Sequence, residues 1–190
     1  MPTPARTSIA GIVAAGRRIL EAEGLEGLTM QAVAVAVGVR APSLYKRVRG
    51  RAELVHLVAN DVATELAVHL DGATRAADPR QNLRAMAEAH RAFARSHPRA
   101  YGLLFAGLPD DWRVDPELNA RVSAVVIRVT AALAGDRHGL EAARTVVAWA
   151  HGFVTMELAD GFRLGPDVDG AFAYGVDRIS AAIDARPGVA

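Results

Sequence analysis

Five basic side chains occupy the stretch from Arg40 to Arg51, and no acidic residue stands among them. Guanidinium and ammonium groups form charge-assisted hydrogen bonds with phosphate, and a guanidinium also fits two acceptors on the edge of guanine. The hydroxyl group of Tyr45 is a further donor to phosphate oxygens. Residues 1–60 hold eight basic and four acidic residues, whereas the whole chain of 190 residues has a net charge of only +1. These residue types predict that the N-terminal part of the chain contacts a polyanion.

The segment before the basic residues, AVAVAVG, starts at Ala32 and alternates as a β-strand does, but we expect a short helix. Thr29 is a good helix N-cap, and Gly38 suits the position just after a helix. Between them, Val33 and Val37 share one helical face. A strand would need neighbouring strands, and segments rich in β-forming residues are scarce in this sequence.

A second short helix is expected after a four-residue turn, Gly38 to Ala41. Pro42 suits the first helical position because its missing N–H would have no partner there. Leu44 and Val48 then share a buried face, which leaves the basic residues between them on the outside. Two short helices joined by a glycine-containing turn form a helix-turn-helix, whose second helix enters the major groove of DNA.

The side chains of this helix pair have expected roles at a DNA duplex. Thr29 caps N–H groups that point at a phosphate, and Arg40 is the candidate for a bidentate contact with guanine. Tyr45, Lys46 and Arg51 are expected to bind phosphates, which fixes the register without reading the sequence. The alternative is a pair of ordinary helices with a solvated basic surface; the cap, the turn, the proline and the aromatic residue together favour DNA binding. The predicted DNA-binding residues are Thr29, Arg40, Ala41, Pro42, Ser43, Tyr45, Lys46, Arg47 and Arg51.

Apolar residues recur at helical spacing through most of the remaining chain, so the predicted fold class is all-α. Gly24 is expected to end the first helix, and Asp71–Pro79 to break a longer helix that starts near Gly50. We predict an N-terminal three-helix DNA-binding domain, 1–51, followed by a C-terminal helical bundle, 52–190, with about nine helices in total. The later elements are expected near Pro79–Ser96, Tyr101–Phe105, Pro116–Ala134, Leu140–Leu158 and Val168–Ile183.

The segment Leu140–Leu158 carries apolar residues on two sides of its expected helix. A helix that is apolar on two sides is buried on two sides, and we assign one side to its own core and the other to a partner subunit. The segment Val168–Ile183 has a single apolar stripe. We therefore predict a homodimer, with an interface that comprises Val146, Phe153, Phe172, Val176, Ile179 and Ile183.

Several other classes of protein are disfavoured. The chain has no cysteine, which excludes disulfides and thiolate metal sites. No apolar run approaches the roughly 20 residues that a membrane span needs, so we expect a soluble cytoplasmic protein without a membrane partner. The histidines lack metal-ligand spacing, and there is no nucleophile motif and no glycine-rich phosphate loop. We expect no metal, no other cofactor and no enzymatic activity.

The stretch GLEGLTMQAVAVAVGVRAPSLYKRVRGRAELV, Gly24 to Val55, resembles the TetR family of bacterial repressors. It shares the family's Gly-Leu before Thr, Ala-Val-Ala in the second helix, Gly-Val at the turn and Leu-Tyr after it. Two positions depart from the family pattern, since Val48 stands where Phe is usual and Arg51 where Lys is usual. The later stretch VVAWAHGFVTMEL, Val146 to Leu158, resembles the Trp-x-His-Gly segment of one C-terminal subgroup.

The resemblance implies a ligand-responsive repressor that binds a near-palindromic double-stranded DNA operator as a homodimer. The 52–190 domain would then hold a small-molecule effector, apolar or aromatic in kind, in a pocket among its helices. Two alternatives stay open: a non-specific architectural DNA-binding protein, and a helical enzyme or small-molecule carrier. The residues expected to line the pocket are His90, Phe93, Tyr101, Phe105, Trp112, Trp149, His151 and Phe153.

Overall fold

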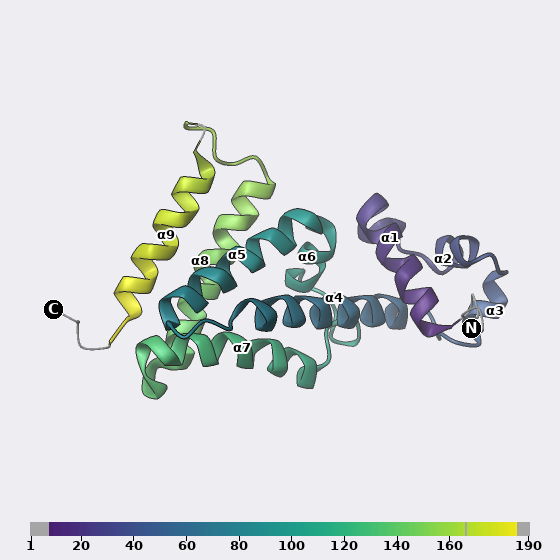
Figure 1. Ribbon diagram of the computed structural model, residues 1–190. Coiled ribbons are helices and arrows are strands. Elements are labelled where there is room, and N and C mark those ends of the chain that lie inside the picture. Colours follow the sequence, from purple (N-terminus) through teal and green to yellow (C-terminus); the bar gives the residue numbers. More distant parts are fainter. Residues whose placement is uncertain (1–7, 166, 186–190) are drawn as a thin grey trace. The chain divides into compact units, whose positions relative to one another are not determined.

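The computed structural model describes residues 8–165 and 167–185, and within these ranges the chain is all-α, as predicted (Figure 1). There are nine α-helices and two short 3-10 helices in the described residues, and no strand. No helix in these ranges is both long enough and apolar enough to cross a bilayer. The elements are α1 (Ile9–Gly27), α2 (Met30–Val37), α3 (Ala41–Tyr45), α4 (Arg51–Ala73), α5 (Pro79–Ser96), α6 (Pro98–Phe105), η1 (Asp110–Trp112), α7 (Pro116–Ala134), η2 (Asp136–His138), α8 (Gly139–Leu158) and α9 (Val168–Ile183).

The chain divides into two compact units. The first unit contains residues 8–65 and 97–119, and the second contains residues 66–96, 120–165 and 167–185. Helices α4 and α7 each begin in the first unit and end in the second. The division at residue 51 into a DNA-binding and an effector-binding domain is a functional one, and it stays a prediction.

In the first unit, α1 packs against α2 and α6, and α2 packs against α3. The side chain of Ser8 caps α1 by accepting a hydrogen bond from the Gly11 N–H at 3.1 Å. The helical path breaks at Gly24, as predicted, because its φ of +78° lies in the left-handed region that favours glycine. One further turn after this break extends α1 to Gly27.

Glu21 of α1 provides the N-terminal cap of α6. Its carboxylate accepts the Ala100 N–H at 2.8 Å, and the Arg99 guanidinium donates back to the Glu21 carbonyl at 3.1 Å. Free N–H groups at a helix start need such an acceptor, and a carboxylate is favoured there by the helix dipole. Arg17 of α1 forms ion pairs with Asp61 and Glu65 of α4. Polar contacts thus join α1 to both α4 and α6 within the first unit.

In the second unit, α5 packs against α8 and α9, and these two helices pack against each other (Figure 1). Their shared core contains Ala87, Phe172 and Val176, with Trp149 and Phe153 packed against it. The Trp149 ring stacks on Phe172 with centroids 5.2 Å apart and an interplanar angle of 26°. Aromatic packing therefore joins the last two helices.

Gly175 of α9 lies directly under the Trp149 ring. A Cβ at this position would stand 2.3 Å from Cζ2 of Trp149, a distance that forces the ring to move. We expect Gly175→Ala to lower the free energy of unfolding by about 1–3 kcal/mol, measured by urea denaturation. Gly152→Ala in α8 is the matched control, because its Cβ would meet no described atom within 4 Å. That variant should gain up to about 1 kcal/mol from helix propensity, and equal losses in both variants would contradict the steric explanation.

Three predicted boundaries are corrected by the structure. Helix α4 runs to Ala73 instead of breaking at Asp71, and the Thr74 N–H and hydroxyl both bond to the Asp71 carbonyl to close its last turn. Helix α6 begins at Pro98, three residues earlier than expected, because a proline is tolerated in the first turn. Pro42 is the second residue of α3 and not the first, since Ala41 already has helical conformation.

Candidate nucleic-acid interface

Local capping makes the AVAVAVG segment helical. The Thr29 side chain accepts the Ala32 N–H at 3.1 Å, which caps α2. At the other end, Gly38 has a φ of +74°, and the N–H groups of Gly38 and Val39 donate to carbonyls of the last turn at 3.0 and 2.9 Å. This paired arrangement is the Schellman motif, which needs a left-handed residue just after the helix. The predicted helix, its cap and its glycine stop are confirmed.

Buried aliphatic side chains hold α3 against α2. Val33, Leu44 and Val48 are fully buried, and Val37 is nearly so. Val48 thus fills its core position although the resemblance leads one to expect a larger Phe there. These contacts fix which face of α3 is turned to solvent, as the shared spacing of Leu44 and Val48 predicts.

Most predicted DNA-binding residues lie on the outside of this helix pair. Tyr45 is 52% exposed, whereas Ala41 is half-buried. Arg40, Lys46 and Arg47 form no ion pair with any residue in the ranges 8–165 and 167–185. Their charges are therefore available to an external anion. The exposed members of the predicted set are Arg40, Pro42, Ser43, Tyr45, Lys46 and Arg47.

Thr29 and Arg51 are already engaged within the chain. The Thr29 hydroxyl serves as the cap of α2. The Arg51 guanidinium donates to the Leu25 carbonyl at 2.7 Å and to the Leu28 carbonyl at 3.1 Å. Its carbon Cζ lies 5.2 Å from the centre of the Trp112 ring. Arg51 therefore points into the first unit instead of presenting a solvated charge.

The remaining basic residue of the stretch, Arg49, is exposed and lies two residues before the start of α4. Its backbone N–H donates to a Glu53 carboxylate oxygen at 2.6 Å, and this bond is the main reason that the pKa of Glu53 is lowered. The arrangement resembles half of a capping box, in which an acidic residue in the first turn reaches back to the residue before the helix. Arg49 thus contributes to the beginning of α4.

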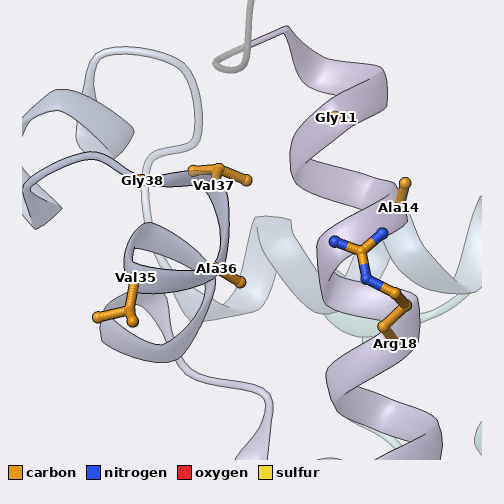
Figure 2. A pocket seen from close by; sticks show the side chains of 7 residues that line it. All are labelled: Gly11, Ala14, Arg18, Val35, Ala36, Val37 and Gly38. Atoms are coloured by element: carbon orange, nitrogen blue, oxygen red, sulfur yellow. The ribbon is translucent and has the colours of Figure 1, made fainter.

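One further cation near the interface, Arg18, is not among the predicted DNA-binding residues. Arg18 of α1 is exposed and lines an open hollow of about 370 Å³ between α1 and the end of α2, which also involves Gly11, Ala14 and Val35–Gly38. Figure 2 shows the Arg18 side chain along α1, next to Ala14, with α2 on the other side of the hollow. Arg18 stands outside the helix-turn-helix motif, so no motif spacing pointed to it.

The residues predicted to line an effector pocket fall into both compact units. His90 borders a small cavity of about 30 Å³ in the second unit, whose other walls are aliphatic. Burial lowers the pKa of His90 to about 4, with a smaller contribution from the charge of His151. The remaining cavity residues are Leu70, Met86, Ala87, Val126, Val146, Val147 and Ala150.

The other predicted pocket residues have different surroundings. Trp149 and Phe153 belong to the aromatic cluster with Phe172, and the Phe93 ring meets His69 edge-on at 5.8 Å. His151 is half-buried, and desolvation lowers its pKa. The last three predicted pocket residues, Tyr101, Phe105 and Trp112, lie in the first unit. Tyr101 is buried, and this burial raises the pKa of its hydroxyl. The Phe105 ring packs on the Tyr101 ring.

The residues predicted for the dimer interface divide into two sets. Val146, Phe172 and Val176 are buried within the protomer, so their burial needs no partner. Phe153, Ile179 and Ile183 are half-buried. Sequence periodicity did not separate these sets, because it gives the apolar side of a helix without saying what covers it. The large apolar side chains exposed on α8 and α9 are Leu140, Val147, Met156, Leu158 and Tyr174.

Comparison with known proteins agrees with this geometry. Residues 12–58 match the family described as bacterial regulatory proteins, tetR family, and residues 83–179 match the tetracyclin repressor-like C-terminal domain. The HTH-type transcriptional regulator Rv0681 of Mycobacterium tuberculosis is 32% identical over 96% of this chain and 84% of its own length. The putative regulatory protein SCO4313 has a crystal structure with a TM-score of 0.76 at 26% identity, covering 94% of this chain and 98% of that one. BioQ, crystallised with its double-stranded DNA operator, has a TM-score of 0.66 at 24% identity, covering 94% of this chain and 99% of that one.

The capped helix-turn-helix, with its cations facing outward, fits the family matches. The chain belongs to the tetR family of bacterial regulatory proteins and is a DNA-binding transcriptional regulator.

Proposed function

We propose that the protein is a homodimeric repressor that binds a near-palindromic operator and leaves it when a small-molecule effector binds. The observation that carries this proposal is the set of exposed cations that flank α3: Arg40, Lys46 and Arg47 form no ion pair with any described residue. A two-fold dimer presents two such helices, so its half-sites would lie about one helical turn apart, roughly 34–36 Å.

Within this proposal the exposed residues divide into readers and anchors. Arg40 stands just before α3 and is assigned a bidentate contact with guanine, with Ala41, Pro42 and Ser43 close to the base edges. Tyr45, Lys46 and Arg47 are assigned to phosphates. BioQ, crystallised with its double-stranded DNA operator, shares this fold, which supports DNA binding in general.

The effector site is proposed for the second unit, next to His90. The cavity walls are aliphatic apart from this imidazole, which favours a compact apolar or aromatic ligand with one polar group. The match of 83–179 to a tetracyclin repressor-like domain supports a ligand role for this part of the chain. We also assign the Trp149–Gly152 segment to the Trp-x-His-Gly subgroup, on its sequence. DNA reading would then belong to 1–51, effector binding and dimerisation to 52–190, and the site of action is the cytoplasm.

The dimer interface is proposed for the outer faces of α8 and α9. The exposed Met156 would gain burial there, together with the half-buried Phe153 on the same side of α8 and the half-buried Ile179 of α9. Burying such surface stabilises an association by about 25 cal/mol per Å² before the costs of ordering are subtracted.

Selection from a library of random DNA duplexes tests the proposal. We expect the protein to recover a near-palindromic sequence, and gel-shift titrations on it to separate the roles of two residues. Lys46→Ala should weaken binding to all duplexes. The plot of log K against log salt concentration has a negative slope, and this variant should reduce the magnitude of that slope by about 0.9. Arg40→Ala should cost about 1–3 kcal/mol on the selected duplex and relax the preference at one base pair.

Arg137→Ala is the matched control, because Arg137 is exposed in η2 of the second unit and has no assigned DNA role. It removes one positive charge and should bind like the parent. Recovery of no preferred sequence would indicate an architectural DNA-binding protein, and absence of DNA affinity even at low salt would sink the DNA-binding assignment altogether.

A further inference from the structure

Arg51 closes the segment that contains the DNA-reading helices. Its guanidinium donates to the Leu25 and Leu28 carbonyls at 2.7 and 3.1 Å, at the end of α1 and directly before the cap of α2. Arg51 itself is the first residue of α4, and five residues separate it from the end of α3 at Tyr45. One side chain thus joins the two ends of the stretch 28–51, which contains α2, the turn and α3. Carbonyls at a helix end lack helical partners, and a guanidinium satisfies two of them at once.

Trp112 covers this guanidinium. Its ring centre lies 5.2 Å from Cζ of Arg51, the spacing of a cation–π contact. Only 34% of the Arg51 side chain is exposed, whereas the nearest carboxylate, that of Glu26, is 4.0 Å away and 95% exposed. The aromatic ring and the two carbonyls therefore determine the orientation of Arg51, and the ion pair contributes little.

The segment that carries Trp112 is itself bound to α4. We call residues 106–115, between α6 and α7, the α6–α7 connector. The His56 ring N–H donates to the Arg113 carbonyl at 2.6 Å. Asn60 donates to the Asp115 carboxylate at 2.6 Å and accepts the Asp115 N–H at 2.9 Å. Together with Arg51, the connector meets α4 at three places along its first three turns.

We propose that Arg51 and Trp112 are positioning residues for DNA recognition, through which the α6–α7 connector sets the placement of α2 and α3. The sequence predicts that Arg51 binds a phosphate, yet its donors are directed to backbone carbonyls of its own chain. Loss of the Trp112 ring or of the guanidinium fork then weakens DNA binding without removing a phosphate contact. The inference rests on the DNA-binding role proposed above and adds how the reading helices are held.

Salt dependence of DNA binding tests the proposal on the full-length protein. The probe is the duplex that the parent protein selects from a random library, titrated over a range of salt concentrations. We expect Arg51→Ala and Trp112→Ala each to weaken binding about tenfold, because a charged hydrogen-bonded group or its support is lost. Their slopes of log K against log salt should equal that of the parent. Lys46→Ala is the reference, with its slope lowered by about 0.9. A slope lowered equally in Arg51→Ala would overturn the proposal, since Arg51 would then be a phosphate contact.

Conservative variants separate positioning from a general loss of folding. Trp112→Phe keeps a flat ring over the guanidinium and should bind within about threefold of the parent. Arg51→Lys keeps the charge but lacks the planar fork, and should lose affinity nearly as Arg51→Ala does. The double variant Arg51→Ala/Trp112→Ala should bind no more weakly than Arg51→Ala alone.

Three results count against the inference: additive losses in the double variant, full affinity in Trp112→Ala, or full affinity in Arg51→Lys. Arg51→Lys keeps the test decisive if Trp112→Ala does not fold, which circular dichroism reveals. A parent that selects no duplex and binds none at low salt contradicts the proposed function. A parent that binds while these variants match it contradicts the positioning role alone.

Discussion

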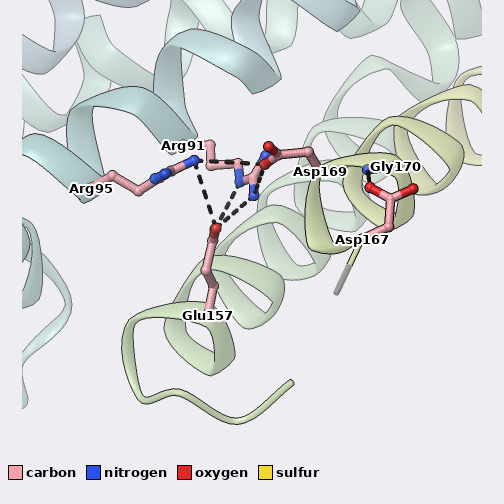
Figure 3. Close-up of polar contacts among 6 residues, drawn as sticks. All are labelled: Arg91, Arg95, Glu157, Asp167, Asp169 and Gly170. Carbon is pink, nitrogen blue, oxygen red and sulfur yellow. Dashed lines mark hydrogen bonds and ion pairs between the residues drawn. The ribbon is translucent and has the colours of Figure 1, made fainter. Parts of the chain in front are cut away.

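Replacing Arg91 by Ala is expected to lower the free energy of unfolding by about 3–5 kcal/mol. Arg91 is largely buried in the second unit, and its guanidinium donates to both carboxylate oxygens of Glu157, at 2.7 and 2.5 Å, and to Asp169 at 2.7 Å (Figure 3). It also lies over the Phe172 ring at 4.7 Å. Truncation would leave the Glu157 carboxylate, whose side chain is 17% exposed, without its main partner. Denaturation by urea, followed by circular dichroism, measures the loss.

Arg95→Ala is the matched control for this prediction. Arg95 stands one turn further along α5 and approaches the same two carboxylates, but at 3.9 and 3.7 Å and with 55% of its side chain exposed (Figure 3). Such a surface ion pair contributes at most about 1 kcal/mol. The Arg91→Ala/Glu157→Ala double variant should lose less than the sum of the single losses, because neither charge is then left buried alone. Equal losses for Arg91→Ala and Arg95→Ala would show that burial is not the cause.

The unfolding free energy is expected to fall by about 3 kcal/mol as the pH drops from about 7 to 4, through His90. Burial lowers the pKa of this imidazole to about 4 in the folded protein, from 6.5 in the unfolded chain. Between these values the unfolded chain binds a proton that folded His90 does not, so stability is present above the unfolded pKa and lost as the pH falls toward the folded one. Chemical denaturation at a series of pH values measures this dependence.

His90→Gln removes the titrating group while keeping a polar side chain of similar length. The unfolding free energy of the parent minus that of this variant should therefore fall steadily from about pH 7 to pH 4, because only the parent loses stability through His90. His138→Gln, at an exposed position in η2, is the control and should keep the pH dependence of the parent. A constant difference between parent and His90→Gln across this range would mean that other groups cause the acid destabilisation.

The local structure of the helix-turn-helix was predictable because its signals are local. Thr29, Gly38 and Val33 each act within one or two helical turns, so their spacing was enough to predict a helix in a segment that alternates as a strand does. Ala has a high helix propensity and fits both the buried and the exposed side of a helix, so the alternation of Ala and Val does not require a strand. The outward placement of Lys46 follows from the burial of Leu44 and Val48 on the other side of the same short segment.

The engagement of Arg51 was not predictable in this way. Its partners Leu25 and Leu28 lie 26 and 23 positions earlier in the chain, and its aromatic partner Trp112 lies on a connector after α6. A single sequence states the charge and face of a residue but not which distant groups its side chain reaches. Trp112 shows the same limit, since as an isolated aromatic residue it suited an effector pocket, whereas in the structure it lies over a guanidinium in the first unit.

The assignment of the last two helices was half predictable. The apolar residues on two sides of α8 indicated that both sides of this helix are covered. Periodicity placed Val146 on an apolar face of α8, and Phe172 and Val176 on the apolar face of α9. Which face belongs to the core depends on the packing of α5, because that helix covers one side of the pair. Three of the six predicted interface residues are therefore core residues of the protomer.

The cavity beside His90 has a volume of about 30 Å³, room for about two water molecules. On the proposal that an aromatic effector binds beside His90, this volume is too small for a ring, so the effector would need a more open form of the second unit. The apparent dissociation constant would then rise in inverse proportion to the population of that form. The observed binding rate would then level off at high ligand concentration, at the rate with which the aliphatic walls separate. Under this proposal, the concentration at which the regulator responds would depend on the cost of opening its own core as well as on the contacts that the effector makes afterwards.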